Sequence, residues 1–243
     1  MTDMTITGHT LHRYDEELLA IHGNLLAMGN KVSAQLKNAL LALHGRNLEI
    51  ARAVIAGDQA VDAIEMKIDE DIVKIIAKRA PVARDLRLLM AISKAVTDIE
   101  RIGDKAVKIA GRTLKIYSGE AARSLDPLLL QGIHTTGQLG IAVFDNVLDA
   151  FATFSMSKAC MVLDEKVRMD NEFRESLSRL ISLVTENADH HGDSLNVVFI
   201  IKSLDRVVDH SENIAEHLIY LLKGEDIRHS CRHNRSDPSG GPL

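Results

Sequence analysis

Two pairs of carboxylates, each with a spacing of four residues, occupy corresponding places in the two halves of the chain. The first pair is Glu100 and Asp104, and the second is Asp205 and Asp209. The offset is constant, since 205 − 100 and 209 − 104 both equal 105. A repeat at a fixed offset indicates a duplicated unit, so each half is expected to carry a similar site. Carboxylates from neighbouring helices can bridge metal ions, which makes metal binding the first chemistry to consider.

A third pair, Glu65 and Asp69, has the same spacing in the first half. Residues four apart stack on one helix face, so each pair places two like charges side by side. Such neighbours repel by roughly a few tenths of a kcal/mol on an exposed helix, and by more beside a low-dielectric core. A bound cation would offset this repulsion. The alternative is a solvated face where Arg101 pairs with Asp98 or Asp104, and the spacing alone does not decide between the two.

Other polar residues offer less specific signals. His210 and His217 lie seven residues apart on the acidic helix of the second half and are candidates for a metal shell. Arg84 and Arg87 flank Asp85 just after Pro81. They suit either a partner or phosphate contact at a helix N-terminus, or a local ion-pair cluster. No phosphate-binding loop of the P-loop type occurs, so nucleotide hydrolysis is not supported.

Apolar periodicity predicts the helices that must position these side chains. Six are expected, with apolar stripes over residues 18–43, 48–79, 86–102, 133–151, 163–184, and from a break at 192–194 to 223. Pro81 ends the second helix, because proline disfavours helix at the preceding residue. Asp126 and Pro127 begin the fourth as N-cap and first helical residue, and Gly224 ends the sixth.

The composition supports an all-α fold. Aromatic residues make up only 3% of the chain and there are four prolines, a balance that favours helices over sheet. Three helices repeated once predict two tandem three-helix bundles. The expected organisation is a disordered tail over 1–8, a first bundle over 9–120, a second bundle over 121–224 and a disordered tail over 225–243.

Charge and cysteine content narrow the functional class. The net charge of −5 lacks the basic excess of a nucleic-acid-binding protein. The two cysteines imply no disulfide framework, which suits a reducing cytoplasm. No signal peptide is evident, and apolar runs such as 197–201 are far shorter than a membrane span. We therefore expect a cytoplasmic protein that reaches a membrane only through its partners.

The residues around the acidic pairs resemble the PhoU family. The resemblance is carried by Pro81 to Arg87 and Asp98 to Asp104 in the first half, and by Leu204 to His210 and Asn213 to Glu216 in the second. It covers nearly the whole chain, from about 14 to 222. It implies two three-helix bundles and a phosphate-responsive regulator that is not an enzyme.

By this resemblance, the protein is a negative regulator of the phosphate regulon. Its partners would be the ATPase component of the phosphate-specific ABC transporter and a sensor histidine kinase. It would couple the two, modulate phosphate uptake and form a homodimer.

Members of the family bind iron or zinc through Glu/Asp-x-x-x-Asp motifs. Carried over to this chain, the metal ligands would be Glu65, Asp69, Glu100, Asp104, Asp205 and Asp209. The second half departs from the pattern, since Val208 stands where Gly103 stands in the first half and Asp205 replaces the usual Glu. The fifth helix offers only Asp164 and Asp170, which are not four apart. The second site is therefore expected to be weaker, different or empty.

Two further hypotheses remain open at this point. A di-iron carboxylate oxidase or metal-storage bundle would commonly use Glu-x-x-His pairs, and the predicted bundles contain none. A structural helical adaptor without metal requires only a solvated charged face. Oxygen consumption by iron-loaded protein tests the first, and elemental analysis tests the second.

Overall fold

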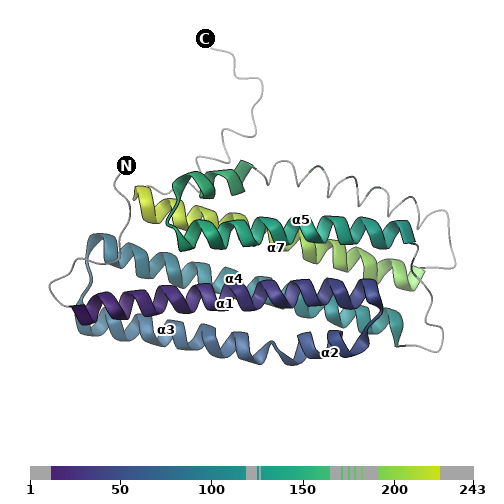
Figure 1. Ribbon diagram of the computed structural model, residues 1–243, viewed down its shortest axis with the longest axis horizontal. Helices are drawn as coiled ribbons and strands as arrows, with labels where there is room; N and C mark the ends of the chain where they lie inside the picture. Colours follow the sequence, from purple (N-terminus) through teal and green to yellow (C-terminus); the bar gives the residue numbers. More distant parts are fainter. Residues whose placement is uncertain are drawn as a thin grey trace, which may run out of the picture.

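The computed structural model describes residues 12–118, 125, 127–164, 171, 175, 178, 182 and 191–224. Its helices are α1 (His12–Gly45), α2 (Leu48–Ala56), α3 (Gln59–Arg79), α4 (Ala83–Tyr117), α5 (Pro127–Ala152) and α7 (His191–Lys223). Residues 156–164 contain a further helical stretch. Long helices lie side by side along the molecule (Figure 1). No strand occurs in the part of the chain that the structure describes, so the all-α prediction is confirmed.

The prediction of one helix over 48–79 is wrong. Asn47 caps the start of α2, and its side-chain oxygen accepts hydrogen bonds from the backbone N–H groups of Glu49 and Ile50, each at 3.1 Å. The chain leaves the helix at Gly57 and Asp58 before α3 begins. Glycine has low helix propensity, which favours a break there. The apolar pattern runs on across it, with Val54 and Val61 both buried, so periodicity could not reveal the interruption.

The predicted break at 192–194 is also wrong, because α7 begins at His191 and contains these residues. The other helix ends agree with the sequence signals. Arg79 ends α3 just before Pro81, Pro127 begins α5, and α7 ends before Gly224, whose φ of +76° is the left-handed conformation that glycine adopts most easily. Both predicted tails, the boundary at 120/121 and most of the predicted fifth helix lie outside the described residues.

The two halves of the molecule pack against each other along their length. α4 makes its most extensive contact with α7 across the halves, and α1 packs on α5. The contact between α1 and α5 is close. A Cβ added at Gly29 would lie 2.4 Å from the side chain of Leu148, and one added at Gly137 would lie 2.4 Å from that of Leu40. α3 packs on α1 and α4 and forms one edge of the molecule (Figure 1). Among the helices described here, none is both long and apolar enough to cross a membrane.

Candidate functional site

Carboxylates in and beside α3 and α4 lie close enough to change one another's titration. We call this set the acidic group: Asp58, Asp62, Glu65, Asp69, Glu100 and Asp104. Burial raises the pKa of Glu65, and repulsion from Glu100, Asp69 and Asp62 raises it further. Burial also raises the pKa of Glu100, followed by repulsion from Asp104, Asp62 and Asp58. The structure thus brings together the four ligands predicted in the first half and adds two carboxylates.

Positive charge beside the acidic group offsets only part of this repulsion. Arg101 lowers the pKa of Glu65, but less than burial and the neighbouring carboxylates raise it. The Lys108 Nζ atom lies 3.0 Å from Oδ2 of Asp104. Both partners of that pair are well exposed, so its contribution to stability is small. Lys105 likewise lowers the pKa of Glu100, but burial and the neighbouring carboxylates still raise it on balance.

Metal binding by the acidic group has chemical support but no preformed geometry. All six side chains offer carboxylate oxygens, the ligands that hard cations prefer. In the described part of the chain, however, no three His, Cys, Asp or Glu side chains form a group that could hold a metal ion. The residues as placed do not fit a metal, and a bound ion would have to draw the carboxylates of α3 and α4 together.

The second-half pair lies in different surroundings. Asp205 and Asp209 are half-buried on α7, and Oδ2 of Asp209 accepts a hydrogen bond from Arg206 at 2.8 Å. Neither is among the main groups that raise the pKa of Glu65 or Glu100. Asp164 is exposed, and Asp170 lies outside the described residues. Asp205 and Asp209 thus lie on α7, whereas the acidic group lies in and beside α3 and α4.

Val208 departs from the family pattern because the two halves distribute volume differently. In the first half, Gly103 leaves room for the buried side chain of Gln35, whose Oε1 lies 3.7 Å from the Cβ position at Gly103. The repeat offset of 105 maps Gln35 onto Gly140 and Gly103 onto Val208. In the second half the Val208 Cγ2 atom lies 3.7 Å from the Cβ position at Gly140. Large and small residues have thus exchanged helices between the halves.

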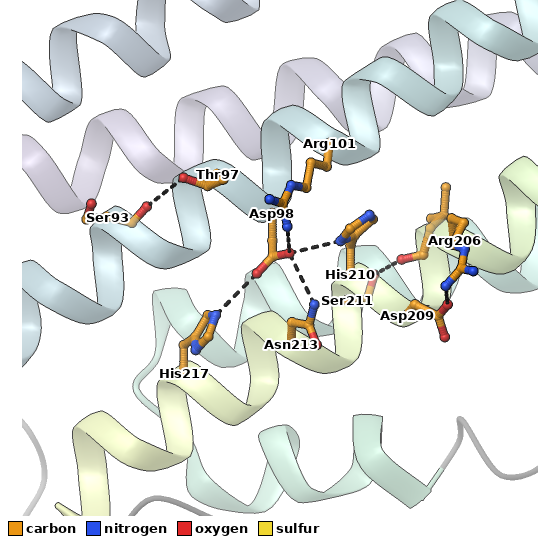
Figure 2. Close-up of polar contacts among 11 residues, drawn as sticks. Ser93, Thr97, Asp98, Arg101, Arg206, Asp209, His210, Ser211, Asn213 and His217 are labelled. Atoms are coloured by element: carbon orange, nitrogen blue, oxygen red, sulfur yellow. Dashed lines mark hydrogen bonds and ion pairs between the residues drawn. The ribbon is translucent and has the colours of Figure 1, made fainter. Parts of the chain in front are cut away.

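A polar cluster joins α4 to α7, and the sequence prediction of metal ligands left out its centre, Asp98. This side chain is buried, with 5% of its surface exposed. Its Oδ1 atom accepts hydrogen bonds from Nδ1 of His210 at 2.9 Å and Nδ2 of Asn213 at 3.2 Å. Its Oδ2 atom accepts one from Nε2 of His217 at 3.2 Å. Figure 2 shows the three donors pointing from α7 toward Asp98.

The donors decide the charge of Asp98. Burial favours its protonated form, but hydrogen bonds from His210, His217 and Asn213 outweigh burial and hold the pKa of this carboxyl well below its usual range. The two histidines, considered above for a metal shell, are instead partners of a carboxylate on another helix. The sequence did carry a signal for this cluster. Residues 210, 213 and 217 are spaced by three and four and so share one helix face.

The residues predicted at the start of α4 separate into different roles. Asp85 accepts a hydrogen bond from the Tyr14 hydroxyl at 3.0 Å and so ties α4 to α1. The guanidinium carbon of Arg87 lies 3.7 Å from the Cβ position at Gly224, beside the end of α7. Arg84 is exposed. A partner or phosphate contact by these residues stays a prediction.

Comparison with known proteins matches the duplicated architecture. A family model described as "PhoU domain" matches residues 25–113 and 133–218, one segment in each half. The chain belongs to the PhoU family. This confirms the family resemblance drawn from the acidic motifs.

Individual members of the PhoU family align over almost the whole chain. The phosphate-specific transport system accessory protein PhoU of Edwardsiella tarda is 36% identical over 229 residues, which are 94% of this chain and 92% of that protein. Its counterpart in Escherichia coli (strain K12) is 35% identical, over 94% of this chain and 93% of that protein. The crystal structure of PhoU from Pseudomonas aeruginosa superposes with a TM-score of 0.81 at 35% identity, covering 87% of this chain and 100% of that one.

Proposed function

We propose that this protein is an accessory regulator of the phosphate-specific transport system. It acts in the cytoplasm as a negative regulator of the phosphate regulon, couples the ATPase component of the transporter to a sensor histidine kinase, and so modulates phosphate uptake. It works through its helical surfaces and not as an enzyme. A homodimer stays part of the prediction.

One observation carries this proposal: the PhoU family match recurs in both halves of the chain, and both halves belong to one packed body. The relatives in Edwardsiella tarda and Escherichia coli are named as accessory proteins of phosphate-specific transport. A related protein of Streptococcus pneumoniae, with a TM-score of 0.79 at 26% identity, is described as a regulatory protein of the phosphate transport system.

Deletion of the gene tests the regulatory role. In medium rich in phosphate, cells without the gene should express phosphate-starvation genes at the level of starved cells, and the gene supplied in trans should restore repression. Unchanged expression in the deletion strain would contradict the proposal. A strain without the kinase serves as the control. If the protein acts through the kinase, deleting its gene in that strain should cause no derepression.

We also propose that the acidic group binds iron or zinc, provided that the ion draws the carboxylates of α3 and α4 closer together than they lie in this structure. The support is the clustering of its carboxylates and the raised pKa values of Glu65 and Glu100. Elemental analysis of untagged protein tests the idea, with the double variant Glu65→Gln, Glu100→Gln expected to lose the metal. The matched control is Glu49→Gln, Glu70→Gln, which changes two exposed glutamates and should keep it. Absence of metal from the unmodified protein would favour the structural adaptor.

A further inference from the structure

α3 carries two apolar stripes, although only one of them packs into the core. The inner stripe is buried and consists of Val61, Ile68, Ile72 and Ile75. On another face, Met66 and Val73 have 66% and 65% of their surface exposed, and Ile76 has 37%. These three are spaced by seven and by three, which is the pattern of a helix face made to meet another helix. No helix in the described part of the chain covers this second stripe closely enough to bury it.

The beginning of α4 extends the second stripe. Leu86 and Met90, four residues apart, are 38% and 43% exposed. A hydrogen bond from Oγ of Ser93 to Oδ1 of Asp69, at 3.4 Å, shows that these two positions are neighbours across the two helices. Asp69 lies three residues after Met66, and Ser93 lies three residues after Met90, so both exposed stripes border the same line of contact between α3 and α4.

We define the α3–α4 strip as the exposed apolar residues on either side of this line, with Val82 between the helices at 75% exposure: Met66, Val73, Ile76, Val82, Leu86 and Met90. Several large apolar side chains gathered on one exposed face mark an interaction surface more often than chance exposure does. The stretch from Met66 to Ile76 rises about 15 Å along α3 at about 1.5 Å per residue. A partner helix of about three turns would match this length.

Charge indicates which kind of helix fits. Met66 lies next to Glu65, so one end of the α3–α4 strip adjoins the acidic group, whose six carboxylates carry more negative charge than one bound divalent ion would neutralise. The opposite end, at the α3–α4 connection, carries the exposed Arg84. A helix has partial positive charge at its N-terminus and partial negative charge at its C-terminus. A helix with its N-terminus over the acidic group would therefore complement both ends.

We propose that the α3–α4 strip is the docking site for one amphipathic helix of a protein of the phosphate-specific transport system. The helix places apolar residues at three-and-four spacing on the strip and points its N-terminus toward the acidic group. This is helix-in-groove recognition with electrostatic orientation. The inference rests on the proposed function, because that function supplies the partner.

Binding to membrane vesicles that contain the phosphate-specific transport system of the same organism tests the inference. The probe variant of the full chain is Val73→Gln, Met90→Gln. It should bind these vesicles at least about tenfold more weakly than the unmodified protein, because it removes two central apolar contacts. The matched control is Leu41→Gln, Met161→Gln, which changes side chains 54% and 59% exposed elsewhere on the molecule and should bind normally. All four positions are exposed, so each variant is expected to fold, which circular dichroism checks.

The outcomes separate the inference from the function on which it rests. Specific binding of the unmodified protein with equal binding of the probe variant would overturn the docking site and leave the proposed function standing. No binding of the unmodified protein above that to vesicles lacking the transport system would overturn both. Sedimentation of the same samples adds one more result: if the unmodified protein is a dimer and the probe variant a monomer, the α3–α4 strip joins two copies of this chain and the proposal is wrong.

Discussion

Asp98 and Glu100 are two carboxylates on one helix, two residues apart, and their surroundings are opposite. Successive residues of an α-helix are rotated by about 100°, so two residues apart means nearly opposite faces. Asp98 faces α7 and accepts three hydrogen bonds, which lower its pKa. Glu100 lies among the carboxylates of the acidic group, and burial and repulsion raise its pKa. The face on which a carboxylate lies, not its residue type, decides whether it stabilises the fold.

This contrast separates a structural role from a functional one. Asp98 ties the first half to the second through three hydrogen-bond donors on α7, and Arg101 on α4 adds an ion pair at 3.9 Å, so its charge belongs to the architecture. Repulsion among the carboxylates of the acidic group lowers the stability of the fold. Residues that a folded protein keeps despite such a penalty often belong to a binding site. Variants of the two carboxylates and of their partners test this contrast.

Removing the carboxylate of Asp98 should produce the largest effect. Asp98→Ala leaves two histidines and an asparagine without their acceptor at the buried contact of α4 with α7. We expect it to lower the free energy of unfolding by about 3 kcal/mol, measured by urea denaturation at neutral pH. Ser203 is the matched control, since the offset of 105 maps Asp98 onto it and its hydroxyl donates a hydrogen bond within α7, to the carbonyl of Phe199. Ser203→Ala should change stability far less, and equal losses would refute the special role of Asp98.

A single donor to Asp98 should matter less than the carboxylate itself. Asn213→Ala removes one hydrogen bond but leaves both histidines on the carboxylate, so we expect a loss of about 1 kcal/mol by the same measurement. If this loss equalled that of Asp98→Ala, the histidines would contribute nothing, and the cluster would reduce to one hydrogen bond.

Neutralising Glu100 should have a smaller effect of opposite sign. Glu100→Gln relieves repulsion within the acidic group and should raise the free energy of unfolding by about 0.5 kcal/mol near pH 7, in metal-free buffer. The value is small because Glu100 is only half-buried. A loss of stability at neutral pH would show that Glu100 makes a favourable contact in the fold.

Low pH should remove the stability effects of both Asp98→Ala and Glu100→Gln, and this pH dependence tests whether charge causes them. The pKa of Asp98 is lowered by folding, so its contribution is present above the usual aspartate value of about 3.9 and is lost as the pH falls toward the folded pKa. The pKa of Glu100 is raised, so its penalty is absent below about 4.3 and develops as the pH rises through the folded pKa. The stability differences of Asp98→Ala and Glu100→Gln from the unmodified protein should therefore both shrink in urea denaturation at low pH, and a difference independent of pH would point to packing instead of charge.

The sequence predicted the helices well where their ends carry chemical signals. Proline at 81 and 127 and glycine at 224 mark helix ends that the structure confirms. The break at Gly57 escaped prediction because apolar residues continue on the same face across it, and Gly192 misled because a single glycine can lie inside a helix.

For the candidate site, spacing identified which carboxylates share a helix face but not what that face meets. Glu65 and Glu100 do come together, because α3 and α4 are neighbours in one hairpin. The partners of Asp98 lie more than 110 residues away along the chain, and only the packing of α4 on α7 joins them. The exchange of volume between Gly103 and Val208 likewise became visible only with their opposing residues.

Titration of individual carboxyl groups by ¹³C NMR tests the central contrast most directly. In metal-free protein labelled at its carboxyl carbons, with Asp98→Asn and Glu100→Gln used to assign the two signals, Asp98 should stay ionised at pH values well below its usual pKa. Glu100 should take up its proton above its usual value of about 4.3. Two ordinary titrations, or a raised pKa for Asp98, would contradict the account of α4 as a helix with a satisfied face and an acidic one.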